Sequence, residues 1–210
     1  KLDEIRLGEV MSKDLVTVDP EMDLRGCAKL MLKEKISSLL VVDAKNSLKG
    51  ILTKTDLATA FEEYFALAHK VKEFMVDRVI TVGPDEPIHI ALLLMVRNQI
   101  SRVVVVQNRH PLGIITGRDL LAAGAYLGSP GKPAKKGYLP FIPSGMKALM
   151  LSSDVMTEKQ ITVTSDSDLA EAAYIMLRNR ISGLPVVDSK GILAGIVTKT
   201  DVVRALAARG

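Results

Sequence analysis

Three copies of one short polar motif carry the side chains in this sequence that are best suited to hold a ligand. Each copy places a threonine after an apolar Gly-Ile stretch and an aspartate three residues later. A hydroxyl group can donate a hydrogen bond to a phosphate oxygen, and a carboxylate can accept hydrogen bonds from two adjacent ribose hydroxyl groups. The motif is therefore a candidate for binding a phosphorylated ribose. Its copies occupy residues 53–56, 116–119 and 198–201.

Helix capping is the alternative interpretation of the same residues. Each motif lies where an expected strand meets an expected helix, and threonine and aspartate are favoured there because they satisfy unpaired backbone N–H groups. The N-terminus of a helix also attracts phosphate through its partial positive charge. Capping and binding are compatible, so the sequence leaves both open.

The motif closes a longer repeat. Each copy is preceded by an acidic residue, one further residue and a methionine. The number of residues from this methionine to the motif aspartate is the same in the three copies to within one. A fixed spacing that recurs three times identifies a structural unit. The three methionines are Met11, Met75 and Met156.

Each unit is expected to run strand, helix, strand, strand, helix. A short extended segment precedes an apolar stripe at positions i, i+3, i+4, i+7 and i+8, which indicates a helix with one buried face. Asp23 and Asp168 stand at N-cap positions, and Pro87 stands in a first turn. Continuous aliphatic runs predict strands covered on both faces, and the second helix is expected to open at the motif aspartate. These runs are residues 39–42, 103–106 and 184–187.

The repeats divide the chain into five segments. A unit of this size cannot bury its sheet and both helices alone, so the repeats are expected to associate in pairs. A Gly-, Pro- and Lys-rich stretch predicts a linker, in which Tyr138, Leu139, Phe141 and Ile142 form a candidate docking patch. The expected segments are repeat 1 (1–61), a linker helix (62–73), repeat 2 (74–124), the linker (125–151) and repeat 3 (152–210).

Composition narrows the class of protein. With 48% hydrophobic and 25% charged residues the chain is globular, and its longest apolar run, 90–96, is too short for a membrane helix. A single cysteine, Cys27, and the lack of a secretory leader fit a cytoplasmic protein. The three histidines share no metal-ligand spacing, and no catalytic constellation is present, so we expect neither a metal site nor an enzyme.

These repeats resemble cystathionine-β-synthase (CBS) domains. The resemblance rests on the Val-Met-Ser opening, the Ile-Ser-Gly-Leu-Pro-Val-Val-Asp strand at 181–188 and the Gly-Ile-Val-Thr close at 195–198, and it covers nearly all of the chain outside 125–151. It implies an α/β fold of tandem β-α-β-β-α units that pair pseudo-symmetrically into Bateman modules. It also implies adenosine-type ligands in the clefts between repeats.

The resemblance assigns roles to individual residues. It places the ribose on Asp56, Asp119 and Asp201, and it gives ribose or phosphate contacts to the neighbouring hydroxyl groups of Thr53, Thr55, Thr116, Thr198 and Thr200. It places the adenine on backbone groups of the first strand and the long strand, at Thr17, Val18, Leu40, Thr81, Val82, Val104, Thr162, Val163 and Pro185.

Repeat 2 departs from the others in its charge. Arg118 replaces the middle threonine, and Arg102 precedes the long strand, where repeats 1 and 3 have Ser38 and Gly183. Two guanidinium groups near one cleft favour a phosphate-rich ligand, because arginine offers planar paired donors. Two solvated surface arginines are the alternative.

We expect a non-catalytic regulatory module that binds an adenine nucleotide, AMP, ADP or ATP, as a regulatory ligand. The alternatives are an interaction or scaffold protein with vestigial clefts, a binder of S-adenosyl compounds, or a nucleic-acid binder that uses the mildly basic surface (net charge +4). An odd number of repeats leaves one without a partner, so we expect either a homo-oligomer or a fourth repeat upstream.

Overall fold

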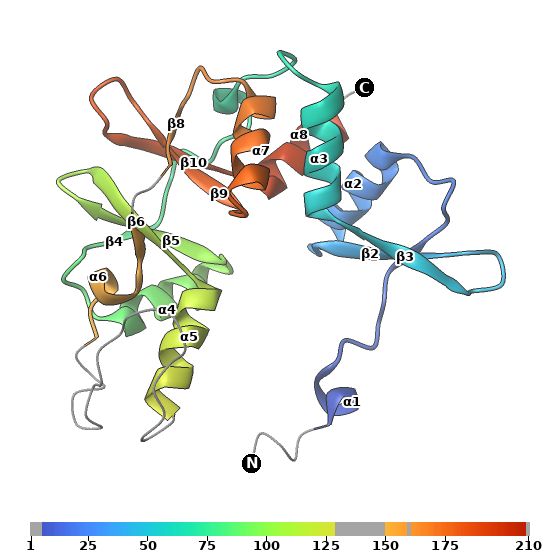
Figure 1. The fold of residues 1–210 in the computed structure, drawn as a ribbon, viewed down its shortest axis with the longest axis horizontal. Helices are drawn as coiled ribbons and strands as arrows, with labels where there is room; N and C mark the ends of the chain where they lie inside the picture. Colours follow the sequence, from blue (N-terminus) through green and yellow to red (C-terminus); the bar gives the residue numbers. More distant parts are fainter. Residues whose placement is uncertain (1–5, 129–149, 159–160, 209–210) are drawn as a thin grey trace. The chain divides into compact units, whose positions relative to one another are not determined.

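The computed structural model describes residues 6–128, 150–158 and 161–208, and each repeat has the expected order of strand, helix, two strands and helix (Figure 1). Repeat 1 comprises β1 (Thr17–Val18), α2 (Leu24–Lys33), β2 (Ser38–Val42), β3 (Leu48–Thr53) and α3 (Lys54–Tyr64). Repeat 2 comprises β4 (Thr81–Val82), α4 (Ile88–Asn98), β5 (Arg102–Gln107), β6 (His110–Thr116) and α5 (Gly117–Gly128). Repeat 3 comprises β8 (Val163–Thr164), α7 (Leu169–Arg178), β9 (Gly183–Val187), β10 (Leu193–Thr198) and α8 (Lys199–Ala208).

Within the described residues, four short elements precede or join the repeats. They are α1 (Leu7–Val10), the 3₁₀ turn η2 (Val71–Glu73), α6 (Ser152–Val155) and β7 (Thr157–Glu158).

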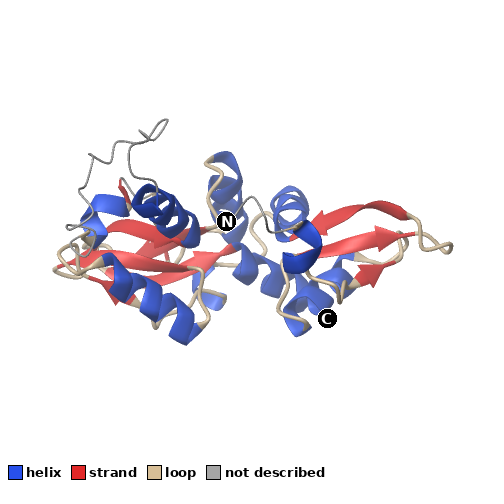
Figure 2. Cartoon of the chain, turned by 90° about the horizontal axis from the view of Figure 1, so that it is seen from below, coloured by secondary structure: helices blue, strands red, loops and turns tan. Residues whose placement is uncertain are grey.

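Each repeat forms its own small sheet. The long second strand lies in the middle, parallel to the short first strand and next to the third. In repeats 1 and 2 the second and third strands run antiparallel, and helices α4 and α5 lie against the strands of repeat 2 (Figure 2). The sheet of repeat 2 gains a fourth strand, because β7 pairs antiparallel with β6.

The first helix of each repeat has well-defined ends. Asp23 and Asp168 are N-caps, as predicted, and accept hydrogen bonds from Gly26 N–H (2.8 Å) and Ala170 N–H (3.1 Å). Pro87 is the N-cap of α4 rather than a first-turn residue. At the other end, each helix is followed by a residue with left-handed backbone, which turns the chain back toward the sheet. These residues are Lys35 (φ 55°), Gln99 (φ 53°) and Arg180 (φ 54°).

The chain divides into two units, and repeat 3 contributes to both. Unit 1 contains repeat 1 together with residues 168–182 and 198–210, which carry α7 and α8. Unit 2 contains residues 71–167 and 183–197, and therefore repeat 2 and the strands of repeat 3 up to residue 197.

Helix packing forms the core of unit 1. Helix α3 packs against α7 and α8, and α2 packs against α8. Their apolar stripes supply fully buried side chains such as Phe61, Met31 and Met176. Cys27, predicted to be a core residue, is 3% exposed, and burial raises the pKa of its thiol.

Reciprocal contacts between two sheets organise unit 2. The segment that leads into repeat 3 lies on the sheet of repeat 2: Val155 and Met156 pack against its core, and β7 extends the sheet. The segment that leads into repeat 2 lies on the sheet of repeat 3, where Val76 and Ile196 exchange two backbone hydrogen bonds of 2.9 Å. Repeats 2 and 3 therefore form the expected pseudo-symmetric pair.

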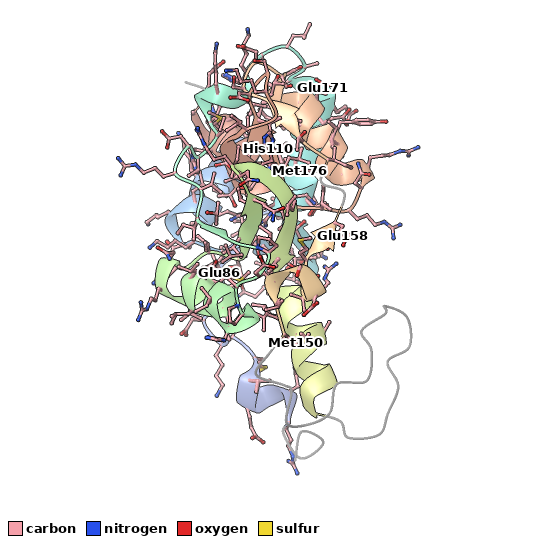
Figure 3. The ribbon with its side chains drawn as sticks, turned by 90° about the vertical axis from the view of Figure 1, so that its left-hand side faces the viewer. Glu86, His110, Met150, Glu158, Glu171 and Met176 are labelled. Atoms are coloured by element: carbon pink, nitrogen blue, oxygen red, sulfur yellow. The ribbon has the colours of Figure 1, made fainter. Side chains whose placement is uncertain are left out.

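The chain before α6 is anchored beside the start of α4 (Figure 3). Ile88 N–H donates to the Met150 carbonyl oxygen (2.9 Å), and Ser152 N–H donates to the Glu86 carbonyl oxygen (2.8 Å). Met150 is 2% exposed. This anchor fixes where the segment enters the sheet of repeat 2.

In repeats 2 and 3, a glycine in the third strand permits the close approach of a methionine that precedes the other repeat. A Cβ atom built on Gly113 would lie 2.8 Å from Cγ of Met156, and one on Gly195 would lie 2.9 Å from Sδ of Met75. Gly50, the equivalent glycine of repeat 1, has no atom within 4 Å of such a position.

Several predicted boundaries differ from the structure. The expected linker helix 62–73 is not one helix, because α3 ends at Tyr64 and Leu67 has left-handed backbone (φ 60°), which a helix cannot continue through. Helix α5 runs to Gly128, four residues into the expected linker 125–151. The strand β2 was expected to be covered on both faces, but only Leu39 in it is buried. The docking patch at 138–142 lies outside the described residues.

The glycine contacts give the first testable prediction. Gly113→Ala should lower the free energy of unfolding by about 1–3 kcal/mol, because its methyl group overlaps Met156 in a packed interface. Gly50→Ala should leave the stability almost unchanged, since the same methyl group meets open space. Thermal and urea unfolding of both variants make the measurement, and equal effects at the two glycines would contradict the packing described.

Candidate functional site

The motif threonine and aspartate are hydrogen-bonded to each other at the start of the second helix of every repeat, and in α3 Thr53 is the N-cap and Asp56 its capping-box partner. The backbone N–H and the hydroxyl group of the motif threonine both donate to one oxygen, Oδ2, of the aspartate three residues later. The helix therefore begins directly after the threonine, two residues before the aspartate at which it was predicted to open. The two distances are 2.7 and 2.7 Å for Thr53 and Asp56, 2.7 and 2.6 Å for Thr116 and Asp119, and 2.7 and 2.8 Å for Thr198 and Asp201.

The second carboxylate oxygen distinguishes the copies. In repeat 3, Oδ1 of Asp201 accepts a hydrogen bond from Nη2 of Arg204 at 2.9 Å, and the residue is only 1% exposed. Asp119 is half-buried and Asp56 is exposed. Solvent and ligands therefore reach the carboxylates of repeats 1 and 2 more readily than that of repeat 3.

Within unit 1, the motifs of repeats 1 and 3 face each other. Nζ of Lys54 donates to Oγ1 of Thr200 at 3.2 Å, and Nζ of Lys199 donates to Oγ1 of Thr55 at 3.1 Å. The two bonds cross between the first turns of α3 and α8. They bring two ammonium groups, two threonine hydroxyl groups and two helix N-termini together.

One of the two ammonium groups in this cluster, that of Lys54, is partly removed from water. Burial lowers the pKa of Lys54, while the nearby negative charge of Asp201 acts in the opposite direction. Lys54 is therefore a partly desolvated cation, and a bound anion would offset the cost of its burial.

In repeat 2 the motif lies beside the two arginines singled out from the sequence. Arg102 is directly opposite Thr116 in the β5–β6 register, and Arg118 is exposed in the first turn of α5. Nη2 of Arg102 also donates to Oγ of Ser101 at 3.3 Å. The structure thus places both guanidinium-bearing residues at the end of the sheet where α5 begins.

The predicted base-binding residues lie on the first and middle strands of each sheet. The valines of the first strands and the middle-strand residues of repeats 2 and 3 are buried, whereas Thr17 and Thr81 are exposed on edge strands. A ligand could reach backbone groups of such an edge strand but not the valine side chains. The buried residues are Val18, Val82, Val163, Val104 and Pro185, and Leu40 is half-buried.

Repeat 3 starts its first strand one residue later than the other repeats. Val104 N–H donates to the Ile80 carbonyl oxygen (3.4 Å) in repeat 2, and Leu40 N–H makes the matching bond to Val16 (3.1 Å). Pro185 has no N–H group to make it. Thr162 therefore precedes β8 instead of belonging to it.

A surface hollow of about 560 Å³ lies at the opposite end of the sheet of repeat 2 from the motif. It is lined by residues of β4 and the loops after β4 and β5, among them Thr81, Glu86 and Arg109. Arg102 and Thr116 pair at one end of β5 and β6, and Gln107 and His110 (Figure 3) pair at the other. The hollow therefore does not include the Thr116–Asp119 motif.

Sequence reasoning missed Lys54 and Lys199. Each lies between the two threonines of a Thr-Lys-Thr-Asp sequence, which repeats 1 and 3 share and in which repeat 2 has Gly117. That shared identity was the available signal. The crossed contacts depend on which helices pack together, and this is not visible along the chain.

The described residues contain neither a candidate metal site nor a candidate membrane-spanning helix. No group of three or more His, Cys, Asp or Glu side chains among them is arranged to hold a metal ion. None of their helices is both long and apolar enough to cross a bilayer.

Comparison with known proteins identifies the repeats. The family model of the CBS domain matches residues 7–63, 71–126 and 152–208. The uncharacterized protein MJ1225 of Methanocaldococcus jannaschii is 26% identical over 198 residues, which cover 93% of this chain and 68% of that protein. Its crystal structure superposes with a TM-score of 0.76 over 95% of this chain.

Other relatives match smaller parts. The uncharacterized protein MJ1232 of M. jannaschii is 37% identical over 118 residues, and the inosine-5'-monophosphate dehydrogenase of Thermoplasma acidophilum is 34% identical over 125 residues. These matches cover 56% and 60% of this chain but only 38% and 21% of those proteins.

Some similar structures contain adenosine compounds. CBSX2, crystallised with AMP, is 27% identical, with a TM-score of 0.53 over 66% of this chain and 96% of that one. The CBS domain pair of MJ0100, crystallised with 5'-methylthioadenosine and S-adenosyl-L-methionine, is 25% identical, with a TM-score of 0.53 over 68% of this chain and 98% of that one.

The unequal surroundings of the motif aspartates lead to a second prediction. Asp56→Ala should cost about 1 kcal/mol of unfolding free energy, the usual value of a lost cap. Asp201→Ala should cost about 2–4 kcal/mol, because it also leaves buried donors and Arg204 without their acceptor. Urea unfolding of the two variants measures the difference, and an equal loss would show that Asp201 acts only as a cap.

Proposed function

Because this chain belongs to the CBS-domain family, we propose that it is a non-catalytic regulatory protein that binds an adenine nucleotide at its Thr-x-x-Asp motifs. The observation that carries the proposal is the crossed pair of Lys54–Thr200 and Lys199–Thr55 hydrogen bonds. It concentrates positive charge and hydroxyl donors at two helix N-termini, which suits phosphate. The adenosine ligands of CBSX2 and of the MJ0100 domain pair support an adenosine moiety.

Charge favours a nucleotide over an S-adenosyl compound. S-adenosyl-L-methionine carries a sulfonium cation beside the ribose, and 5'-methylthioadenosine has no charge there. The cationic side chains near the motifs would repel the sulfonium group and would gain little from the uncharged thioether. These side chains are Lys54 and Lys199 in unit 1 and Arg102 and Arg118 in repeat 2. A phosphate chain would pair with them.

In this proposal the nucleotide is held by three kinds of group. The free carboxylate oxygen of Asp119 or Asp56 accepts the ribose hydroxyl groups, the hydroxyl and cationic groups receive the phosphates, and edge-strand backbone near Thr17 or Thr81 contacts the base. Occupancy would change the packing of the motif helices, and a partner protein would detect that change. We also propose a cytoplasmic location, because the chain has a single cysteine.

The capping geometry favours one second candidate. Each motif aspartate already accepts two hydrogen bonds from its threonine, and Asp201 is also held by Arg204. A motif that serves only to cap would make the chain an interaction protein with vestigial clefts.

Calorimetric titration separates the two candidates. The protein should release or absorb heat with AMP, ADP or ATP and bind at least one of them more tightly than 5'-methylthioadenosine or S-adenosyl-L-methionine. No heat and no rise in melting temperature with any nucleotide would rule out the regulatory proposal. Tighter binding of the sulfonium compound would assign the site to S-adenosyl ligands.

Neutralising the crossed lysines gives a third prediction. Lys54→Gln with Lys199→Gln should weaken nucleotide binding roughly 10–150-fold, the range for losing a hydrogen bond to a charged group. Lys33→Gln, a change of an exposed lysine on α2, is the matched control and should leave the affinity unchanged. Equal affinity of the double variant and the control would place the phosphates elsewhere.

The ribose assignment gives a fourth prediction. Asp119→Asn keeps an oxygen for the cap but loses the charge that strengthens hydrogen bonds from ribose, so affinity for an occupied repeat 2 site should fall roughly tenfold or more. The melting temperature of the ligand-free variant serves as the control for lost capping. If a nucleotide still bound with unchanged affinity to both Asp119→Asn and Asp56→Asn, the motif would be architecture alone.

A further inference from the structure

Each lysine of the crossed pair in unit 1 contacts the motif of the other repeat. Nζ of Lys54, in repeat 1, donates to Oγ1 of Thr200 at 3.2 Å, and Nζ of Lys199, in repeat 3, donates to Oγ1 of Thr55 at 3.1 Å. These partners are 146 and 144 residues apart in the sequence. The packing of α3 against α8 brings them together.

A motif lysine is poorly placed to serve the threonine of its own motif. The two residues are neighbours in the first turn of a helix, as Lys54 and Thr55 are in α3. Side chains at positions i and i+1 of a helix point about 100° apart and do not face each other. The ammonium group that reaches each threonine hydroxyl therefore comes from the other repeat.

The charges in the cluster follow the same crossed pattern. Burial lowers the pKa of Lys54, and the opposing effect comes from the negative charge of Asp201, which is the motif aspartate of repeat 3. The ammonium group of Lys54 therefore lies in the field of the other repeat's motif. Repeat 2 has Gly117 at the lysine position and takes no part in this exchange.

We propose that each of these lysines determines the phosphate specificity of the motif in the other repeat. The inference rests on the proposed function. A phosphate beside Thr55 is contacted by Lys199, and a phosphate beside Thr200 is contacted by Lys54. Neither position is complete within one repeat, because its threonine lies on one helix and its lysine on the other. Nucleotide binding is thereby linked to the packing of α3 against α8.

Double-mutant cycles in the affinity for AMP test the exchange of lysines. They are measured in an Asp119→Asn background, so that the repeat 2 site contributes little. Lys199→Gln with Thr55→Val, or Lys54→Gln with Thr200→Val, should be non-additive: where each single change weakens binding roughly tenfold, the double variant should bind about as weakly as either one. The matched control pairs lie within one motif, Lys54 with Thr55 and Lys199 with Thr200, and their fold-losses should multiply.

A conservative variant separates a charge contact from a structural role. Lys199→Arg should recover most of the affinity that Lys199→Gln loses, because it keeps the positive charge, and melting temperatures of the ligand-free variants verify that each one folds. Coupling within one motif, or additivity of every pair, would overturn this inference while nucleotide binding itself stood. If the unaltered protein bound no adenine nucleotide, the proposed function would be wrong and this inference with it.

Discussion

Two hydrogen bonds to a single aspartate oxygen determine where the second helix of each repeat starts. The threonine at the end of the third strand donates both, so strand and helix meet at a fixed junction in all three repeats. Everything proposed for the site depends on this junction. It leaves the other carboxylate oxygen outside these two bonds, and it places the first helical turn, with its positive end, directly after the third strand.

The junction also explains why three nearly identical motifs differ chemically. The capping bonds are the same in every copy, so differences arise from what surrounds the second oxygen and the next side chains. Arg204 occupies that oxygen in repeat 3, crossed lysines join repeats 1 and 3, and arginines stand beside the motif of repeat 2. A common scaffold thus carries unlike electrostatic surroundings, and these decide which ligand each copy suits.

Features set by neighbours along the chain could be predicted from the sequence. The N-caps Asp23 and Asp168, the order of elements and the pairing of repeats follow from local spacing and from the resemblance among the copies. Features set by contacts distant in sequence could not. The facing of Lys54 and Thr200, the burial of Asp201 and the choice of repeat 3 as the partner of both other repeats depend on which helices and sheets pack together. The prediction of a linker helix was wrong for a local reason. Leu67 has left-handed backbone, but it is neither a glycine nor an asparagine, so the sequence does not indicate this conformation.

The division of repeat 3 between the two units bears on how the chain is made. Unit 1 lacks α7 and α8, and unit 2 lacks β9 and β10, until repeat 3 has been synthesised. Neither unit can close before then, and the helices of repeat 1 must wait for partners more than a hundred residues away. Contacts of such separation slow folding and keep apolar surface exposed in the meantime. Repeat 3 therefore completes both cores, and a nascent chain that stops before it would hold two incomplete cores.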